Sequence, residues 1–167
     1  EDIRQRIKRE LDVTVSIGVS YNKVFAKLGS DMKKPDAITE ISPENFRSKV
    51  WPLPVSDLLF VGRATTEKLT KMGVMTIGEL AKTPEFILKN HFGKNGTMLR
   101  NFANGEEHSR VDEYGSVPPM KSMSNSITTP RDMTCREDIL RVMTALCDGI
   151  GRRLRAEGMV GRRVSVY

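Results

Sequence analysis

The chain has 167 residues, of which 38% are hydrophobic, and this is enough for one large or two small domains with a core. Its formal net charge of +6 favours a polyanionic partner, either nucleic acid or an anionic membrane surface. No apolar run approaches the roughly 20 residues that cross a bilayer, and the N-terminus is charged, so we expect no membrane partner and a cytoplasmic location.

The two ends of the sequence have the patterns of interrupted elements. Ile3, Ile7 and Leu11 make the apolar stripe of a helix at the first residues, and residues 164–167 have the pattern of a strand at the last ones. Natural domains rarely begin and stop inside an element. We therefore expect a fragment of a longer protein.

A strand, a helix and a second strand are predicted first. Apolar and polar residues alternate over residues 13–20, which is typical of a strand with one buried face. The period then changes to that of a helix over residues 22–32, which Pro35 prevents from continuing. Residues 37–41 are predicted to return as a short strand, and Ser42-Pro43 to start a short helix.

The Pro-rich residues 51–54 indicate a first domain boundary, after which several short helices are predicted up to residue 104. One helix is predicted over residues 66–72 and is ended by Gly73, and another over residues 93–103. A capping box at residues 76–79 and Thr83-Pro84 each indicate the start of a further helix. Residues 106–119 have little periodicity and are predicted to be a linker.

Beyond the linker the pattern predicts strand, helix and strand. Residues 122–129 are rich in Ser and Thr, so we expect a strand that faces a ligand or lies at an edge. A capping box at residues 134–137 starts a long helix that Gly158 ends. The inward stripe of this helix is Ile139, Met143, Leu146, Ile150 and Leu154.

One segment of the helical region has the pattern of a phosphate-binding hairpin. It runs through Leu58-Leu59-Phe60-Val61-Gly62-Arg63 and continues with Thr65, Leu69, Gly73, Thr76 and Gly78. This resembles a helix-hairpin-helix, in which the free amides at a helix start bind a phosphate without reading a base. An ordinary pair of antiparallel helices with a Gly turn is the alternative. Gly93, Lys94 and Gly96 suggest a second hairpin, for which a plain loop is the alternative.

The sharpest motif is S-x-G-x-x-x-N-K-x-x-A-K-x-x-S-D-x-x-K-P, which occupies residues 16–35. It resembles the end of the palm in Y-family (translesion) DNA polymerases, of the DNA polymerase IV or UmuC-like kind. The hairpin, the linker and Lys121-Ser122 follow in the family's order, so the resemblance covers nearly the whole chain. Without the family, the lysines of this motif would be a solvated helix face.

The resemblance implies roles for individual residues. Lys34 looks like the lysine that holds the β- and γ-phosphates of the incoming nucleotide, and Asn22 and Lys23 match a pair that shapes the palm. The DNA-binding residues that it implies are Val61, Gly62, Arg63, Thr65, Gly93, Lys94, Gly96, Lys121, Ser122, Ser124 and Asn125.

The sequence also departs from the family's pattern. Phe60 stands where the hairpin usually has its first glycine, so we expect this turn to be built differently. Met123 and Ser124 replace the usual isoleucine and glycine after Lys121-Ser122. Residues 125–132 look more like the UV-protection branch of Gram-positive bacteria than like DNA polymerase IV.

The metal-binding carboxylates are the largest departure. The family holds two Mg²⁺ ions with three palm carboxylates, which lie upstream of the first strand. Asp12, Asp31 and Asp36 do not occupy those positions and are predicted to be turn and capping residues. His91 and His108 lack ligand partners at a useful spacing. We therefore expect no metal site, no catalytic residue and no polymerase activity in this chain by itself.

Together these patterns predict a mixed α/β chain in four parts: a palm remnant (1–52), an all-helical thumb (53–105), a linker (106–120) and a partial little finger of strand, helix and strand (121–167). The resemblance implies that the longer protein is a DNA-directed DNA polymerase for translesion synthesis, with primer-template DNA, deoxynucleoside triphosphate and Mg²⁺ as ligands and a sliding clamp as a further partner. The alternatives are a non-enzymatic helix-hairpin-helix module of a repair complex and a binder of anionic membranes or acidic partners.

Overall fold

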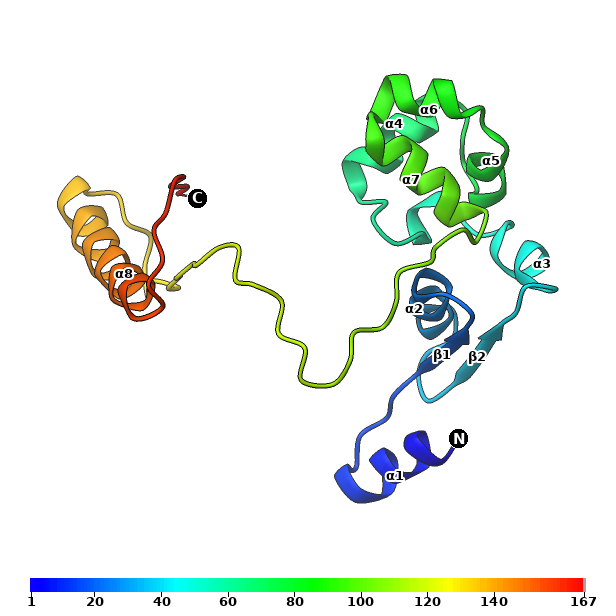
Figure 1. Ribbon diagram of the computed structural model, residues 1–167, viewed down its shortest axis with the longest axis horizontal. Helices are drawn as coiled ribbons and strands as arrows, with labels where there is room; N and C mark the ends of the chain where they lie inside the picture. Colours follow the sequence, from blue (N-terminus) through cyan, green and yellow to red (C-terminus); the bar gives the residue numbers. More distant parts are fainter. Residues whose placement is uncertain (167) are drawn as a thin grey trace. The chain divides into compact units, whose positions relative to one another are not determined.

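The computed structural model describes residues 1–166 and divides the chain into two compact units. The first is Glu1–Val111 and the second is Asp112–Tyr167, each with its own elements (Figure 1). The mixed α/β class that the sequence predicts is confirmed, because the described elements are a two-stranded sheet with helices.

A parallel pair of strands with a crossover helix opens the first unit. Strand β1 (Ile17–Ser20) pairs with β2 (Ile38–Ile41), and helix α2 (Lys23–Met32) connects them, as a parallel connection requires. The buried face of α2 packs on the sheet (Figure 1). This confirms the predicted strand, helix and return strand. The face predicted to be buried in the first strand is wrong: Val13 and Val19 are about half exposed, at 51% and 49%, whereas Gly18 lies against the backbone of α2.

The N-terminal helix is held by the turn that follows α2. None of the residues of α1 (Asp2–Leu11) is buried. The carboxylate of Asp36 accepts hydrogen bonds from Arg4 and from Lys8, whose Nζ lies 2.6 Å from Oδ2. These hydrogen bonds, that of Lys8 first, lower the pKa of Asp36. Asp36 therefore links α1 to the turn after α2 through two hydrogen-bonded ion pairs.

A short connection leads from the sheet to the helical part. Helix α3 (Phe46–Val50) begins later than Ser42-Pro43 suggests, because Asn45 first forms a turn in which its side chain accepts the amide of Ser42 at 2.9 Å. A 3-10 helix, η1 (Val55–Asp57), follows the Pro-rich residues. Trp51 between them donates its indole N–H to the carbonyl of Ala103, 3.1 Å away.

Four short helices then surround one apolar core. They are α4 (Arg63–Lys71), α5 (Ile77–Lys82), α6 (Glu85–Phe92) and α7 (Lys94–Ala103). Gly73 (φ 79°) follows α4 in the left-handed conformation, and the capping box of Thr76 and Glu79 starts α5, as the sequence predicts. Fully buried Leu69, Ile77, Leu80 and Leu88 come from three of these helices.

The second unit contains one long helix, α8 (Arg136–Ala156), and extended chain. The strands predicted at 122–129 and 164–166 are wrong for the described residues, because these segments have no hydrogen-bonded neighbour there; residue 167 lies outside them. Residues 122–129 instead run beside α8, where Arg153 donates to the carbonyl of Ser124 at 3.1 Å. In the predicted inward stripe of α8, Met143, Leu146, Ile150 and Leu154 are half-buried and Ile139 is exposed, so this face is only partly covered by the described residues.

The predicted capping box at the start of α8 is also wrong. Cys135 is the N-cap residue, and no side chain caps the helix. The carboxylate of Glu137 accepts from the Cys135 thiol at 2.6 Å and so is turned away from the backbone amide it was expected to bind. Among the helices described, none combines the length and the apolar character needed to cross a membrane.

Candidate nucleic-acid interface

A tight hairpin precedes α4 and leaves backbone amides free. The amide of Val61 donates to the carbonyl of Leu58 at 3.0 Å, and Gly62 is the N-cap residue of α4. The first intrahelical bond runs from the amide of Thr66 to the carbonyl of Gly62, at 2.9 Å. The amides of the first turn, at residues 63–65, have no acceptor inside the helix, and the helix dipole adds positive potential there. This is the geometry that binds a phosphate oxygen.

Phe60 forms the turn of this hairpin in an unusual conformation. Its φ is 71°, in the region that glycine adopts without cost. The turn is therefore formed with phenylalanine itself in a glycine-type backbone conformation. The side chain remains 64% exposed, and its ring centroid lies 6.0 Å from that of Phe102. A strained residue thus displays an aromatic ring to solvent.

A second hairpin joins α6 to α7 through one residue. Gly93 has a φ of 59°, so the two helices meet directly and the alternative of a plain loop is excluded. The amide of Gly96 donates to the carbonyl of Gly93 at 3.1 Å, and a Cβ at Gly96 would lie 2.2 Å from the carbonyl oxygen of Leu88. Gly96 therefore permits close packing of the helices, whereas exposed Lys94 and Asn95 present the first turn of α7.

A cleft of about 480 Å³ lies between the two hairpins. It is lined by Phe60, Thr65, Lys68, His91, Phe92, Asn95, Met98 and Leu99. Thr65 belongs to the first turn of α4 and Asn95 to the first turn of α7. The fold therefore places both helix starts beside one cleft, which the sequence did not predict, because spacing along the chain does not indicate which hairpins face each other.

Lys34 lies exposed just after α2. Its ammonium is 2.7 Å from the carboxylate of Asp31, which also pairs with Lys27. Hydrogen bonds from Lys27 and then Lys34 lower the pKa of Asp31. Asp31 is a helical residue with two cationic partners, so its prediction as a turn or capping residue is wrong. The Lys34 side chain is 61% exposed and can reach a soluble anion.

The carboxylates of this chain do not fit a magnesium site. Asp12 and Asp36 are turn residues with φ of 52° and 55°, as predicted. The carboxylates of Asp31 and Asp36 are already neutralised by lysine and arginine. Within residues 1–166, no group of three His, Cys, Asp or Glu side chains could hold a metal ion.

Asn22 joins the two ends of the first unit. It is 7% exposed, and its side-chain oxygen accepts the amide of Phe25 at 2.7 Å, which caps α2. Its side-chain nitrogen donates to the carbonyl of Gly105, 83 residues away, at 3.1 Å. Lys23 continues this contact, because its amide donates to Glu107 at 3.1 Å and its ammonium to the carbonyl of Arg110. The capping role of Asn22 could be expected from an asparagine at a helix start. Its hydrogen bond to Gly105 could not be predicted from the sequence.

The substitution Asn22→Asp separates these two roles. An aspartate at this position would still cap α2 but would place a charge against the Gly105 carbonyl, so we expect a loss of about 1–3 kcal/mol in the free energy of unfolding. Amide hydrogen exchange at residues 105–110 should increase while that of α2 does not. The control is Asn45→Asp, since the described structure gives the Asn45 side chain an acceptor role. Unchanged exchange at residues 105–110 would contradict this assignment.

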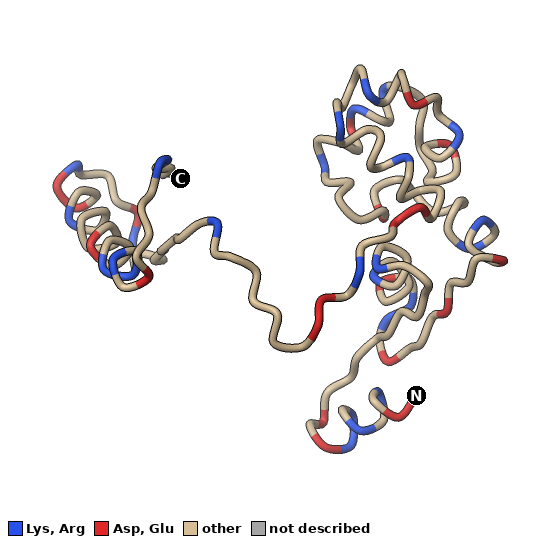
Figure 2. The backbone as a smooth tube through the Cα atoms, viewed as in Figure 1, with Lys and Arg blue, Asp and Glu red and all other residues tan. Residues whose placement is uncertain are grey.

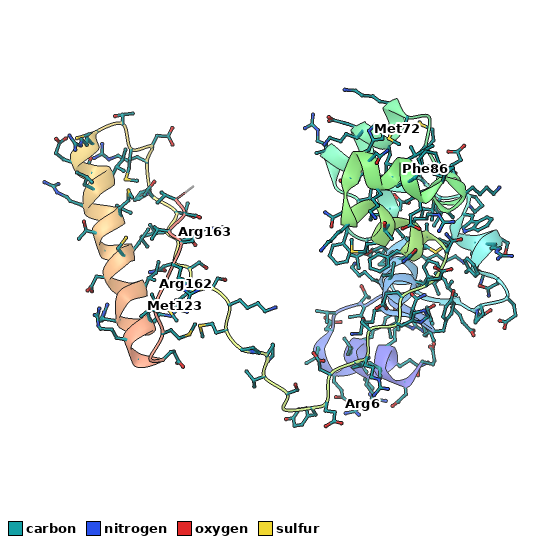
Figure 3. The ribbon with its side chains drawn as sticks, turned by 45° about the horizontal axis from the view of Figure 1, so that its top comes forward. Arg6, Met72, Phe86, Met123, Arg162 and Arg163 are labelled. Carbon is teal, nitrogen blue, oxygen red and sulfur yellow. The ribbon has the colours of Figure 1, made fainter. Side chains whose placement is uncertain are left out.

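The predicted contacts of the second unit lie on extended chain. Lys121, Ser122, Ser124 and Asn125 are all exposed. The side-chain nitrogen of Asn125 lies beside Gly149 of α8. Figure 3 shows Met123 of the same segment next to this helix. Figure 2 shows basic residues along α8, among which Arg152 and Arg153 are exposed. Acidic residues also lie along α8, and Arg152 pairs with Asp148 at 3.3 Å. The segment and the helix therefore present mixed charge, with Lys121 and Arg153 among the exposed cations.

These features define a class: a small helical domain with hairpin-presented amides, joined to the end of a βαβ unit. Two family models match it. Residues 56–107 match "DNA polymerase-iota, thumb domain", and residues 120–167 match "impB/mucB/samB family C-terminal domain". The chain belongs to the Y-family of DNA polymerases.

Curated relatives cover almost all of the chain. DNA polymerase IV of Acetivibrio thermocellus is 52% identical over 165 residues, which is 99% of this chain and 41% of that protein. DNA polymerase IV of Clostridium acetobutylicum is 38% identical over 98% of the chain and 41% of its own length. DNA polymerase IV 1 of Bacillus subtilis is 38% identical over 99% and 40%. These names favour the polymerase IV branch over the UV-protection branch that residues 125–132 suggest.

A solved structure has the same fold over part of the chain. DinB from Sulfolobus solfataricus matches with a TM-score of 0.60 at 23% identity, over 66% of this chain and 33% of that one. This likeness concerns the fold alone. The chain spans about two fifths of the length of the curated relatives that it matches.

Proposed function

We propose that this chain is the DNA-gripping part of a DNA-directed DNA polymerase that carries out translesion synthesis in DNA repair. The observation that carries the proposal is the free first turn of α4 behind a tight hairpin, in a chain 52% identical to a DNA polymerase IV. Phosphate contacts of this kind position a duplex without reading its sequence, as a polymerase that copies any template requires.

The four parts have separate tasks in this proposal. Residues 1–52 are the end of the palm, residues 53–105 the thumb, and residues 121–167 the start of the little finger, with residues 106–120 as the linker. The span of the thumb model, 56–107, supports the second part, and the division of the chain after Val111 supports a boundary in the linker.

The proposed DNA contacts follow from the donors that remain free. Gly62, Arg63 and Thr65 would hold one phosphate at the start of α4, and Lys94 another at the start of α7. Val61, Gly93 and Gly96 would shape the hairpins, because the amides of all three donate to carbonyls of the protein. Lys121, Ser122, Ser124 and Asn125 would line a DNA strand with polar groups.

Lys34 would bind the triphosphate of the incoming nucleotide, exchanging the carboxylate of Asp31 for phosphate oxygens. We assign Mg²⁺ to carboxylates of the whole polymerase outside these residues, since those described here do not fit it. The whole protein would act in the cytoplasm, with a sliding clamp as a further partner.

Salt dependence of duplex binding tests the proposal. We expect the affinity of the chain for duplex DNA to fall steeply with salt, and Lys121→Ala to reduce the slope of log K against log salt by about one, because one phosphate contact is lost. The control is Lys49→Ala, since the ammonium of Lys49 donates to the carbonyl of Glu40. Equal binding of duplex DNA and an acidic polypeptide would instead favour a general binder of polyanions.

The second candidate is a non-enzymatic helix-hairpin-helix module of a repair complex. It explains the two hairpins equally well. It gives no reason for an exposed lysine at residue 34 in a motif that a triphosphate-binding palm carries, and none for identity to polymerases that extends across the whole chain.

A further inference from the structure

We propose that the cleft between the two hairpins binds an unpaired nucleobase of single-stranded DNA, with the ring of Phe60 as the stacking surface. This rests on the proposed function, since it adds a second form of DNA ligand to the duplex backbone that the hairpins would hold.

The lining of the cleft suits a base. Phe60 and Phe92 supply aromatic surface, and Thr65, His91 and Asn95 supply hydrogen-bonding groups. A nucleobase has two apolar faces and a polar edge, so it matches both kinds of group. The volume of about 480 Å³ lies in the range of small-molecule sites.

The conformation of Phe60 is the second observation. A side chain at φ 71° strains the backbone relative to glycine, and a ring that is 64% exposed recovers little of this cost through burial. Strained residues of this kind concentrate at functional sites. Phe86 on α6 is similarly exposed, at 68%, but it sits in regular helix and does not line the cleft (Figure 3).

The charge of the lining favours an anionic ligand. Among the lining residues Lys68 is the one with a formal charge, and it makes none of the ion pairs found within residues 1–166. The first turns of α4 and α7 reach the cleft through Thr65 and Asn95. Phosphates on either side of a bound base would therefore meet free amides at two helix starts.

Binding of abasic DNA tests this directly, because an abasic strand keeps its phosphates and loses its bases. We expect the whole 167-residue chain to bind a short oligothymidine at least about fivefold more tightly than an abasic strand of equal length, by fluorescence anisotropy at one salt concentration. Phe60→Ala should abolish this preference. Phe60→Tyr, which keeps the ring, and Phe86→Ala, which is matched in exposure, should retain it.

A preference that survives in Phe60→Ala, or its absence in the unaltered chain, would overturn the inference. Duplex binding measured on the same proteins separates this from the proposed function. If duplex DNA still binds with salt dependence while the base preference is missing, only the inference fails. If neither form of DNA binds, both fail. Circular dichroism of each variant establishes that the helices are intact.

Discussion

Gly62→Ala is expected to weaken duplex binding by about tenfold or more without lowering the stability of the chain. A methyl group at this position would meet no protein atom within 4 Å, and the φ of −84° is open to any residue. It would project from the hairpin where a phosphate is proposed to approach. Loss of one charge-assisted hydrogen bond, about 1.5–3 kcal/mol, corresponds to a factor of at least about ten.

This substitution separates a ligand contact from a structural role. The dissociation constant for a short duplex, measured by anisotropy, should rise, whereas the midpoint of thermal unfolding should stay the same or rise slightly. Gly161→Ala is the matched control, because a methyl group there also meets nothing within 4 Å. If Gly62→Ala bound duplex DNA as the unaltered chain does, the hairpin before α4 would not be the phosphate site.

Gly18→Ala has the opposite expected profile. A Cβ at Gly18 of β1 would lie 1.8 Å from the carbonyl oxygen of Ala26 and 2.5 Å from the amide nitrogen of Ser30, both in the backbone of α2. The helix would have to move away from the sheet, and we expect a loss of about 3 kcal/mol in the free energy of unfolding. Chemical denaturation followed by circular dichroism measures this loss.

The control for Gly18→Ala is Gly62→Ala, which adds the same methyl group in open space. Exchange of the amides of β2 should increase in Gly18→Ala and not in the control, because β2 forms its sheet with β1 under α2. A change in unfolding free energy below about 0.5 kcal/mol would show that the helix and strand are not as closely packed as described.

Local signals in the sequence predicted most of the first unit. The change of period after Asn22 was enough for α2, since this helix buries one face. Alternation over residues 13–20 indicated the strand but not its packed face, because Gly18, and not the alternating valines, lies against α2. Thr76 and Glu79 form the capping box that their spacing indicates. The same spacing failed at residues 134–137, where the Cys135 thiol binds the carboxylate that the cap requires.

The remaining features depend on contacts between distant residues. Nothing in the spacing of Asn22 indicates a bond to Gly105, and nothing in the hairpin motif indicates that Thr65 and Asn95 share a cleft. Residues 122–129 have strand propensity, but a strand also needs a neighbour, and the described part of the second unit offers none. The sequence position of Phe60 likewise did not indicate that a phenylalanine would adopt a positive φ.

Residues 22–51 make hydrogen bonds to the helical part that follows them in the first unit. The carbonyl of Trp51 accepts the amide of Gly78 at 3.0 Å, its indole holds the carbonyl of Ala103, and Asn22 holds Gly105 just beyond. Removal of the residues before the proposed palm boundary would leave the amide of Gly78 in α5 and the carbonyls of Ala103 and Gly105 without these partners. The helices from α4 to α7 are therefore not an independent domain. Transferring them to another protein would require residues 22–51 to be transferred as well.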